Sequence, residues 1–156
     1  MTFQKIFVIQ KLEGISQYLK EVKALLEFQD KEILADSGKL HIAERLLQLI
    51  VDTMIDINQH FIKELDLPLS EDFQSTFYIL AENNILPADF AKKIAPVVGL
   101  RNRVIHRYET LDNALFISSF RKEYADFQEY IKLITTHLET LDNIGWIAVL
   151  FFIYAL

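Results

Sequence analysis

The chain has no cysteine among its 156 residues. This absence excludes disulfide bridges, thiolate metal sites and thiol nucleophiles, and it is typical of a protein kept in a reducing compartment. The N-terminal residues also lack the long apolar stretch and the small-residue cleavage site of a secretory signal. We therefore expect a cytoplasmic protein.

Positive charge is scarce as well. The chain has 16 Lys and Arg residues against 22 Asp and Glu residues, which gives a formal net charge of -6. This balance excludes a broad basic surface that would wrap duplex nucleic acid or lie on anionic lipid, so any contact with nucleic acid must be small and local. With 51% hydrophobic residues the chain is too apolar to be disordered, and its length suits one domain.

Glycine and proline are rare, with 4 and 3 copies, and no segment alternates with the period of a strand. Apolar residues instead recur at three- and four-residue steps, which predicts an all-α bundle of four to five helices. The first expected helix lies within residues 3–28, and the second is capped by Asp36 and ends before Pro68. The third runs from Ser70 to Asn84. The fourth is opened by Pro87, broken near Ala95 by Pro96 and resumed to Arg107, and the last is capped by Asp112 and runs to Leu141.

The last segment, residues 143–156, is apolar all round. It is shorter than the roughly 20 residues that a membrane span needs, so we do not expect a membrane anchor. Burial within the bundle or in a subunit interface is the preferred interpretation. We predict one helical domain over residues 1–142, followed by this tail, which is not a separate domain.

The residues that could take part in catalysis are concentrated in residues 100–109. Arg101, Arg103 and Arg107 accompany His106 in an otherwise acidic chain. Arginine offers a planar fork of donors to phosphate oxygens, and histidine can exchange a proton near neutral pH. Because no carboxylate cluster for Mg²⁺ stands nearby, the favoured reaction is metal-free attack of an RNA 2'-hydroxyl on the adjacent phosphorus.

A structural role for the same residues stays open. Arg101 and Arg103 could pair with Asp or Glu on a neighbouring helix, and Tyr108 could pack at a helix end. The other histidines, His41, His60 and His137, have no acidic partner or basic cluster around them in the sequence. No spacing typical of metal ligands occurs, so neither a metal nor another cofactor is expected.

The spacing of Arg101, four residues, His106, one residue and Tyr108 resembles the R-x4-H-x-Y signature of the HepT-like branch of the HEPN superfamily. These are small all-α ribonuclease toxins. The likeness extends to residues 43–49, 58–60 and 84–87 and covers roughly residues 1–140.

The resemblance implies a role for each motif residue. Arg101 would bind or polarise the scissile phosphate, and His106 would act as general acid or base. Asn102 and Arg103 would support them, Asn102 by orienting the imidazole or the substrate. Tyr108 would accept AMP from a cognate MNT-type nucleotidyltransferase antitoxin, which would place an anionic group among the arginines and block RNA.

The resemblance further implies a type VII toxin–antitoxin system, cleavage of tRNA or mRNA, and a homodimer whose two motifs face each other. Transesterification needs both an acid and a base, and one motif supplies one histidine, so a symmetry mate could supply the second. Two alternatives remain at this point. One is a non-catalytic HEPN module that binds nucleotide or supports a nucleotidyltransferase, and the other is a purely structural oligomer.

Overall fold

The computed structural model describes residues 3–106 and 111–141, which form seven α-helices and no strand. The expected all-α bundle is confirmed. The described residues form more helices than the four to five expected, because one short helix was not anticipated and the expected break at Pro96 divides the fourth expected helix in two. The helices are α1 (Lys5–Leu25), α2 (Asp30–Ala35), α3 (Ser37–Glu64), α4 (Ser75–Glu82), α5 (Ala88–Ile94), α6 (Val97–His106) and α7 (Asn113–Thr140).

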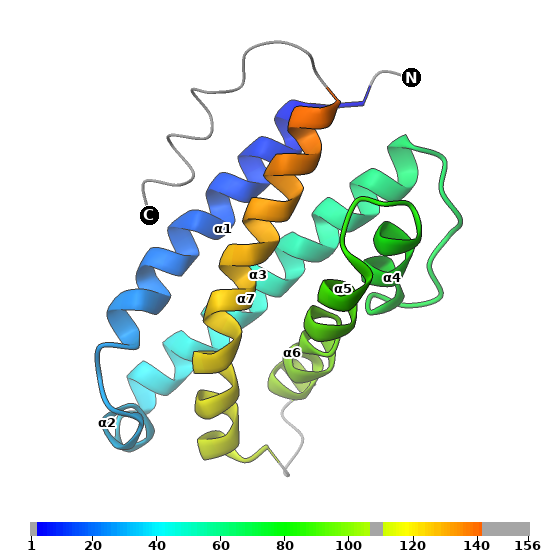
Figure 1. The fold of residues 1–156 in the computed structure, drawn as a ribbon. Coiled ribbons are helices and arrows are strands. Elements are labelled where there is room, and N and C mark those ends of the chain that lie inside the picture. The colour runs from blue at the N-terminus through cyan, green and yellow to red at the C-terminus, as the bar shows by residue number, and fades with distance from the viewer. Residues whose placement is uncertain (1–2, 107–110, 142–156) are drawn as a thin grey trace.

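Three long helices form the body of the bundle (Figure 1). Helices α1, α3 and α7 contact one another pairwise, and the short helices α4 and α6 pack against α3. Helix α2 lies at one end of the bundle, where it contacts both α3 and α7. Helix α3 is therefore the central element, and its neighbour α6 carries Arg101 and His106 of the motif.

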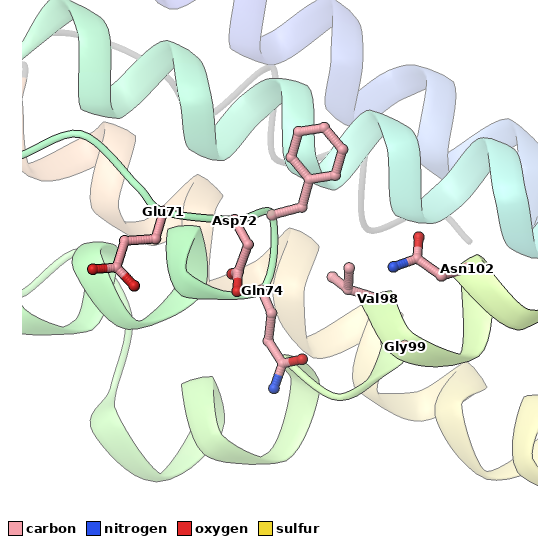
Figure 2. Close-up of a pocket in the computed structure, with 7 residues that line it drawn as sticks. Glu71, Asp72, Gln74, Val98, Gly99 and Asn102 are labelled. Atoms are coloured by element: carbon pink, nitrogen blue, oxygen red, sulfur yellow. The ribbon is translucent and has the colours of Figure 1, made fainter.

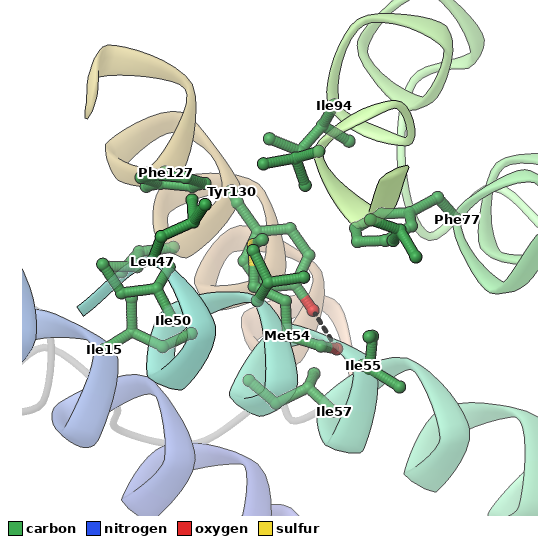
Figure 3. Close-up of a cluster of buried hydrophobic side chains, with 14 of the residues drawn as sticks. Ile15, Leu47, Ile50, Met54, Ile55, Ile57, Phe77, Ile94, Phe127 and Tyr130 are labelled. Carbon is green, nitrogen blue, oxygen red and sulfur yellow. Dashed lines mark hydrogen bonds between the residues drawn. The ribbon is translucent and has the colours of Figure 1, made fainter. Parts of the chain in front are cut away.

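The core lies where the apolar faces of the long helices meet (Figure 3). Side chains such as Leu47, Ile50 and Met54 are fully buried on α3, at the three- and four-residue spacing that predicted this helix. Tyr130 of α7 is also fully buried, and its hydroxyl donates to the carbonyl oxygen of Met54 at 3.3 Å. The core is thus continuous from α1 across α3 to α7.

Aspartate caps begin two of the three long helices, as predicted. The Oδ1 atom of Asp36 accepts from the backbone N–H of Lys39 at 3.2 Å, and the Oδ1 atom of Asp112 accepts from that of Leu115 at 3.0 Å. Each carboxylate satisfies a backbone donor that has no partner within its helix.

The predicted start of the third expected helix at Ser70 is wrong. Helix α4 begins at Ser75, because Asp72 and Ser75 bond each other: the Asp72 carboxylate accepts from Ser75 N at 2.7 Å, and Ser75 Oγ donates to the Asp72 carbonyl at 2.8 Å. The helix ends where predicted. Asn84 adopts a positive φ of 58°, and the N–H of Ile85 returns to the Leu80 carbonyl at 2.9 Å, which closes the last turn.

Several sequence-based expectations fall on residues outside the described part of the chain. These are the apolar tail, residues 143–156, and the motif residues Arg107 and Tyr108. Within the described residues, none of the helices combines the length and the apolar character that crossing a membrane requires.

Candidate active site

Helix α6 carries two residues of the motif, Arg101 and His106. Pro96 lacks the backbone N–H that would continue α5, so α5 ends at Ile94 and α6 begins at Val97. The buried residues of α6 are Val97, Val98, Leu100 and Val104, which fix the helix against the bundle. The residues between them, at positions 101, 102, 103 and 106, are left half-buried or exposed.

Arg101 is the most firmly held of these residues, with a side chain only 17% exposed. Its Nε donates to Oδ1 of Asp52 on α3 at 2.7 Å, and its second terminal nitrogen, Nη2, lies 2.5 Å from the same oxygen. Its Nη1 donates to Oδ1 of Asn102 at 2.9 Å. These contacts use three of the five N–H donors of a guanidinium and leave two for a ligand.

The alternative that Arg101 pairs with an acidic residue of a neighbouring helix is therefore realised, with Asp52 as the partner. This pairing is compatible with phosphate binding, because it fixes the plane of the guanidinium without using all its donors. Asp52 was not identified from the sequence. Its only signal there is a carboxylate on the long helix close to the predicted apolar seam, and nothing local connects it with a residue 49 positions away.

Asn102 and His106 lie four residues apart and so share one face of α6. The carbonyl oxygen of the Asn102 side chain is directed to Arg101, its neighbour in the chain, and holds one end of the guanidinium. The structure thus brings Arg101 and Asn102 into direct contact, whereas the resemblance implied that Asn102 orients the imidazole or the substrate.

His106 and Arg103 are exposed in the last turn of α6. Five residues separate Arg101 from His106, a rise of roughly 7.5 Å along a helix. The same spacing places the two side chains roughly 140° apart around the axis of α6. The Arg103 guanidinium lies in the last turn of α6, where the partial negative charge of a helix C-terminus favours a cation.

Two cavities flank α6. One of about 350 Å³ lies between Val98, Gly99 and Asn102 of α6 and residues 71–74, which precede α4 (Figure 2). The other, of about 270 Å³, lies between Val104 and Ile105 and the first half of α3, where His41, Glu44, Arg45 and Gln48 line it. The motif helix is thus bordered by open space on two sides.

The other histidines lie in different surroundings. His60 is half-buried against Phe7, with ring centroids 4.5 Å apart, and burial lowers its pKa. His137 packs edge-on against Phe61, and burial lowers its pKa too. Among residues 3–106 and 111–141, no three His, Asp or Glu side chains gather in a way that could hold a metal ion.

The structure is thus an all-α bundle that carries an arginine and a histidine on a short helix packed against its central helix. A family model described as HepT-like, "Ribonuclease HepT-like", matches residues 15–134. The chain belongs to this HepT-like ribonuclease family.

Two sequence relatives are nucleases by name. The tRNA nuclease HepT of Aphanizomenon flos-aquae is 34% identical over 142 residues, which cover 90% of this chain and 95% of that protein. The mRNA nuclease HepT of Shewanella oneidensis is 25% identical, over 81% of this chain and 95% of that protein.

The fold has matching solved structures. One is a tri-AMPylated HEPN toxin of Shewanella oneidensis in complex with an MNT antitoxin, with a TM-score of 0.77. The match has 22% sequence identity and covers 83% of this chain and 97% of that chain. At this identity the likeness establishes the shared fold.

Proposed function

We propose that the chain is an endoribonuclease toxin that cleaves tRNA or mRNA without a metal ion and is neutralised by a cognate MNT-type antitoxin. The related tRNA and mRNA nucleases support the substrate class. Arg101 supports the site most directly, because Asp52 and Asn102 orient its guanidinium while two of its N–H donors remain for phosphate oxygens.

The reaction is a transesterification at phosphorus. The RNA 2'-oxygen forms a new bond to the adjacent phosphorus, the bond to the 5'-oxygen breaks, and the products carry a 2',3'-cyclic phosphate and a 5'-hydroxyl. His106 takes the proton of the 2'-hydroxyl or returns one to the leaving oxygen. Arg101 offsets the negative charge that grows on the phosphate oxygens. DNA lacks the nucleophile and is not cleaved.

A homodimer completes the site in this proposal. One motif supplies a single histidine, whereas the reaction needs a base for the nucleophile and an acid for the leaving oxygen. Two chains related by a two-fold axis place two copies of α6 at one cleft. Arg103, exposed on α6, would then add positive charge to that cleft.

Tyr108 is the proposed point of control. The MNT-type antitoxin would transfer AMP to its phenolic oxygen, and the added phosphate would compete with RNA for Arg101, Arg103 and Arg107. The AMPylated Shewanella oneidensis toxin in complex with its MNT antitoxin supports this assignment by analogy of family and fold.

Cleavage is tested with the unmodified protein, single-stranded RNA and tRNA in a chelator such as EDTA. We expect products with cyclic phosphate ends, and a loss of at least about 100-fold in rate for His106→Ala and for Arg101→Ala. Lys20→Ala, which removes an exposed positive charge from α1, is the matched control and should keep full activity. Intact RNA at every salt concentration would reject the nuclease proposal.

Modification is tested separately by mass. Coexpression with the antitoxin should add one or more AMP units to the wild-type chain and none to Tyr108→Phe. A Tyr108→Phe protein that still gains AMP would exclude this tyrosine as the acceptor.

A further inference from the structure

The larger cavity beside α6 lies next to the phosphate-binding candidate. Asn102 belongs to its wall, and the Oδ1 atom of Asn102 accepts from Arg101 Nη1 at 2.9 Å. A ligand in the cavity is therefore one side chain away from the arginine. Its volume of about 350 Å³ is at the small end of the ~300–1,000 Å³ that ligand pockets occupy, which suits one planar ring system.

Phe73 is the aromatic residue of this cavity, and its side chain is 43% exposed although the core lies close by. The backbone beneath it is held by a buried relay. Thr76 Oγ1 donates to the Phe73 carbonyl at 2.6 Å, and Asn58 Nδ2 of α3 donates to Thr76 Oγ1 at 3.1 Å. Asn58 and Thr76 are fully buried, so the exposed ring stands on a fixed support.

The relay continues to the far side of the bundle. Tyr130 of α7 donates from its hydroxyl to Asn58 Oδ1 at 2.8 Å. The reciprocal bonds between Asp72 and Ser75 fix the same segment from the surface side. A ring that is ordered before binding loses little conformational entropy when a ligand stacks on it.

Charge divides the site into two parts. Glu71 and Asp72 line the cavity and repel a phosphate, while Arg101 beyond Asn102 attracts one. Asn102 and Gln74 both line the cavity (Figure 2), and their side-chain amides offer donors and acceptors for the polar edge of a ring. A neutral aromatic group of a ligand is thus favoured inside the cavity, and an anionic group is favoured at its rim.

We propose that this cavity binds one nucleobase of the RNA strand adjacent to the scissile phosphate, with the base stacked on Phe73 and its edge bonded by Asn102 and Gln74. This inference rests on the proposed ribonuclease function, for which it adds the site that selects where the strand is cut. Stacking on one aromatic ring strengthens binding roughly 5- to 150-fold.

The test uses an uncleavable 2'-O-methyl oligonucleotide that carries the fluorescent base 2-aminopurine, whose emission falls when it stacks. The wild-type protein should quench the emission, Phe73→Leu should weaken binding roughly 5- to 150-fold with loss of quenching, and Phe73→Tyr should retain both. Phe28→Leu is the matched control, because Phe28 is 42% exposed on the turn after α1, outside the cavity. It should bind like the wild type.

Cleavage positions on a long RNA provide the second measurement. Phe73→Leu should spread the cuts over more sequences and raise KM, with kcat changed much less. If Phe73→Leu quenches, binds and cuts as the wild type does, the cavity proposal is overturned while the nuclease stands. If the wild type quenches the probe but leaves RNA intact, the nuclease proposal fails and the base-binding cavity is retained.

Discussion

At the scale of single residues, the ion pair between Asp52 and Arg101 is the contact that gives the motif its shape. Asp52 belongs to α3, and within the described residues its side chain contacts the motif through Arg101. Two nitrogens of the guanidinium meet one carboxylate oxygen, which fixes the rotation of the long side chain about its axis. Asp52 is therefore a positioning residue.

Asp52→Asn should lower activity although Asp52 does not contact the RNA. The neutral amide attracts the guanidinium less, so Arg101 samples more orientations, and we expect kcat/KM to fall on the order of 10- to 100-fold. Because both side chains are partly exposed, the free energy of unfolding should change by only about 1 kcal/mol or less. Cleavage kinetics and urea unfolding measure the two effects.

A purely structural role for Asp52 would give the opposite pattern, with a large loss of stability and unchanged kinetics in the folded fraction. Asp56→Asn serves as the control, since Asp56 forms an exposed ion pair with Lys11 of α1, one turn further along α3. It should leave kcat/KM unchanged.

The partly buried carboxyl of Glu123 on α7 makes the stability of the fold depend on pH. Burial raises the pKa of Glu123 to about 7, with the nearby Asp126 carboxylate adding to the rise and Lys93 opposing it. Its Oε2 atom is buried without a hydrogen-bond partner, whereas Asp126 pairs with Lys93 of α5. The folded state therefore favours the neutral acid.

Stability should consequently fall as the pH rises from about 4.5 to above 7, because the unfolded chain releases the Glu123 proton first and the folded state holds it longer. Glu123→Gln keeps the neutral form, so it should match the wild type near pH 5 and exceed it at pH 8 by about 1–2 kcal/mol, allowing for partial exposure. Urea unfolding at several pH values tests this. An equal difference at pH 5 and pH 8 would contradict it, and Glu13→Gln on the exposed face of α1 is the control.

At the scale of helices, local signals in the sequence predicted those boundaries that local chemistry determines. Asp36 and Asp112 cap their helices and Pro96 separates α5 from α6, as expected. Helix α2 was not predicted, because six residues with one buried side chain, Ile33, show no period. Long-range contacts hold it: Arg121 of α7 donates to Asp30 and to two carbonyls of the preceding turn.

The start of α4 and the partners of Arg101 were not predicted because both depend on contacts between side chains that the sequence pattern does not show. The bonds between Asp72 and Ser75 place the start of α4 at Ser75, and Asn58 of α3 supports that start from across the bundle by donating to Thr76 Oγ1. In the same way the motif predicted Arg101 and its neighbour Asn102, but Asp52 joins them only after α3 and α6 pack. The sequence pattern therefore identifies the chemistry, and packing supplies the partners.

The buried relay that joins α7, α3 and the start of α4 can be tested with Tyr130→Phe. The change removes the hydroxyl that donates to Asn58 Oδ1, which leaves a fully buried acceptor without this donor. We expect a loss of about 1–3 kcal/mol in the free energy of unfolding. Hydrogen exchange should also become faster at the N-terminal turn of α4, because Asn58, which donates to Thr76, is no longer held by Tyr130.

Tyr124→Phe on the same helix is the matched control. Tyr124 is half-buried, and burial raises the pKa of its hydroxyl. Because its hydroxyl takes no part in the Asn58–Thr76 relay, its removal should cost less than that of Tyr130 and leave exchange in α4 unchanged. Equal effects of the two substitutions would show that the relay does not hold α4.

At the scale of the whole molecule, charge is divided unequally between the body and the motif. The formal net charge is -6, yet three of the 16 basic residues fall within residues 101–107. A compact site on an acidic body attracts a phosphate over a short range and repels the rest of a long RNA. Selectivity for one position in the strand follows from this arrangement, since the surrounding surface contributes little unspecific affinity.

The salt dependence of binding measures how local this attraction is. Three arginines that neutralise three phosphates of a single strand predict a slope of about -2 in a plot of log affinity against log salt concentration. The measurement uses His106→Ala, which should bind without cutting, and a short labelled RNA. Arg103→Gln should make the slope shallower by about 0.7, whereas Lys20→Ala on α1 should not change it. Two facing motifs, with six arginines, would give at most about -4, so a slope steeper than about -5 would mean that many more phosphates touch the protein and would contradict the compact site.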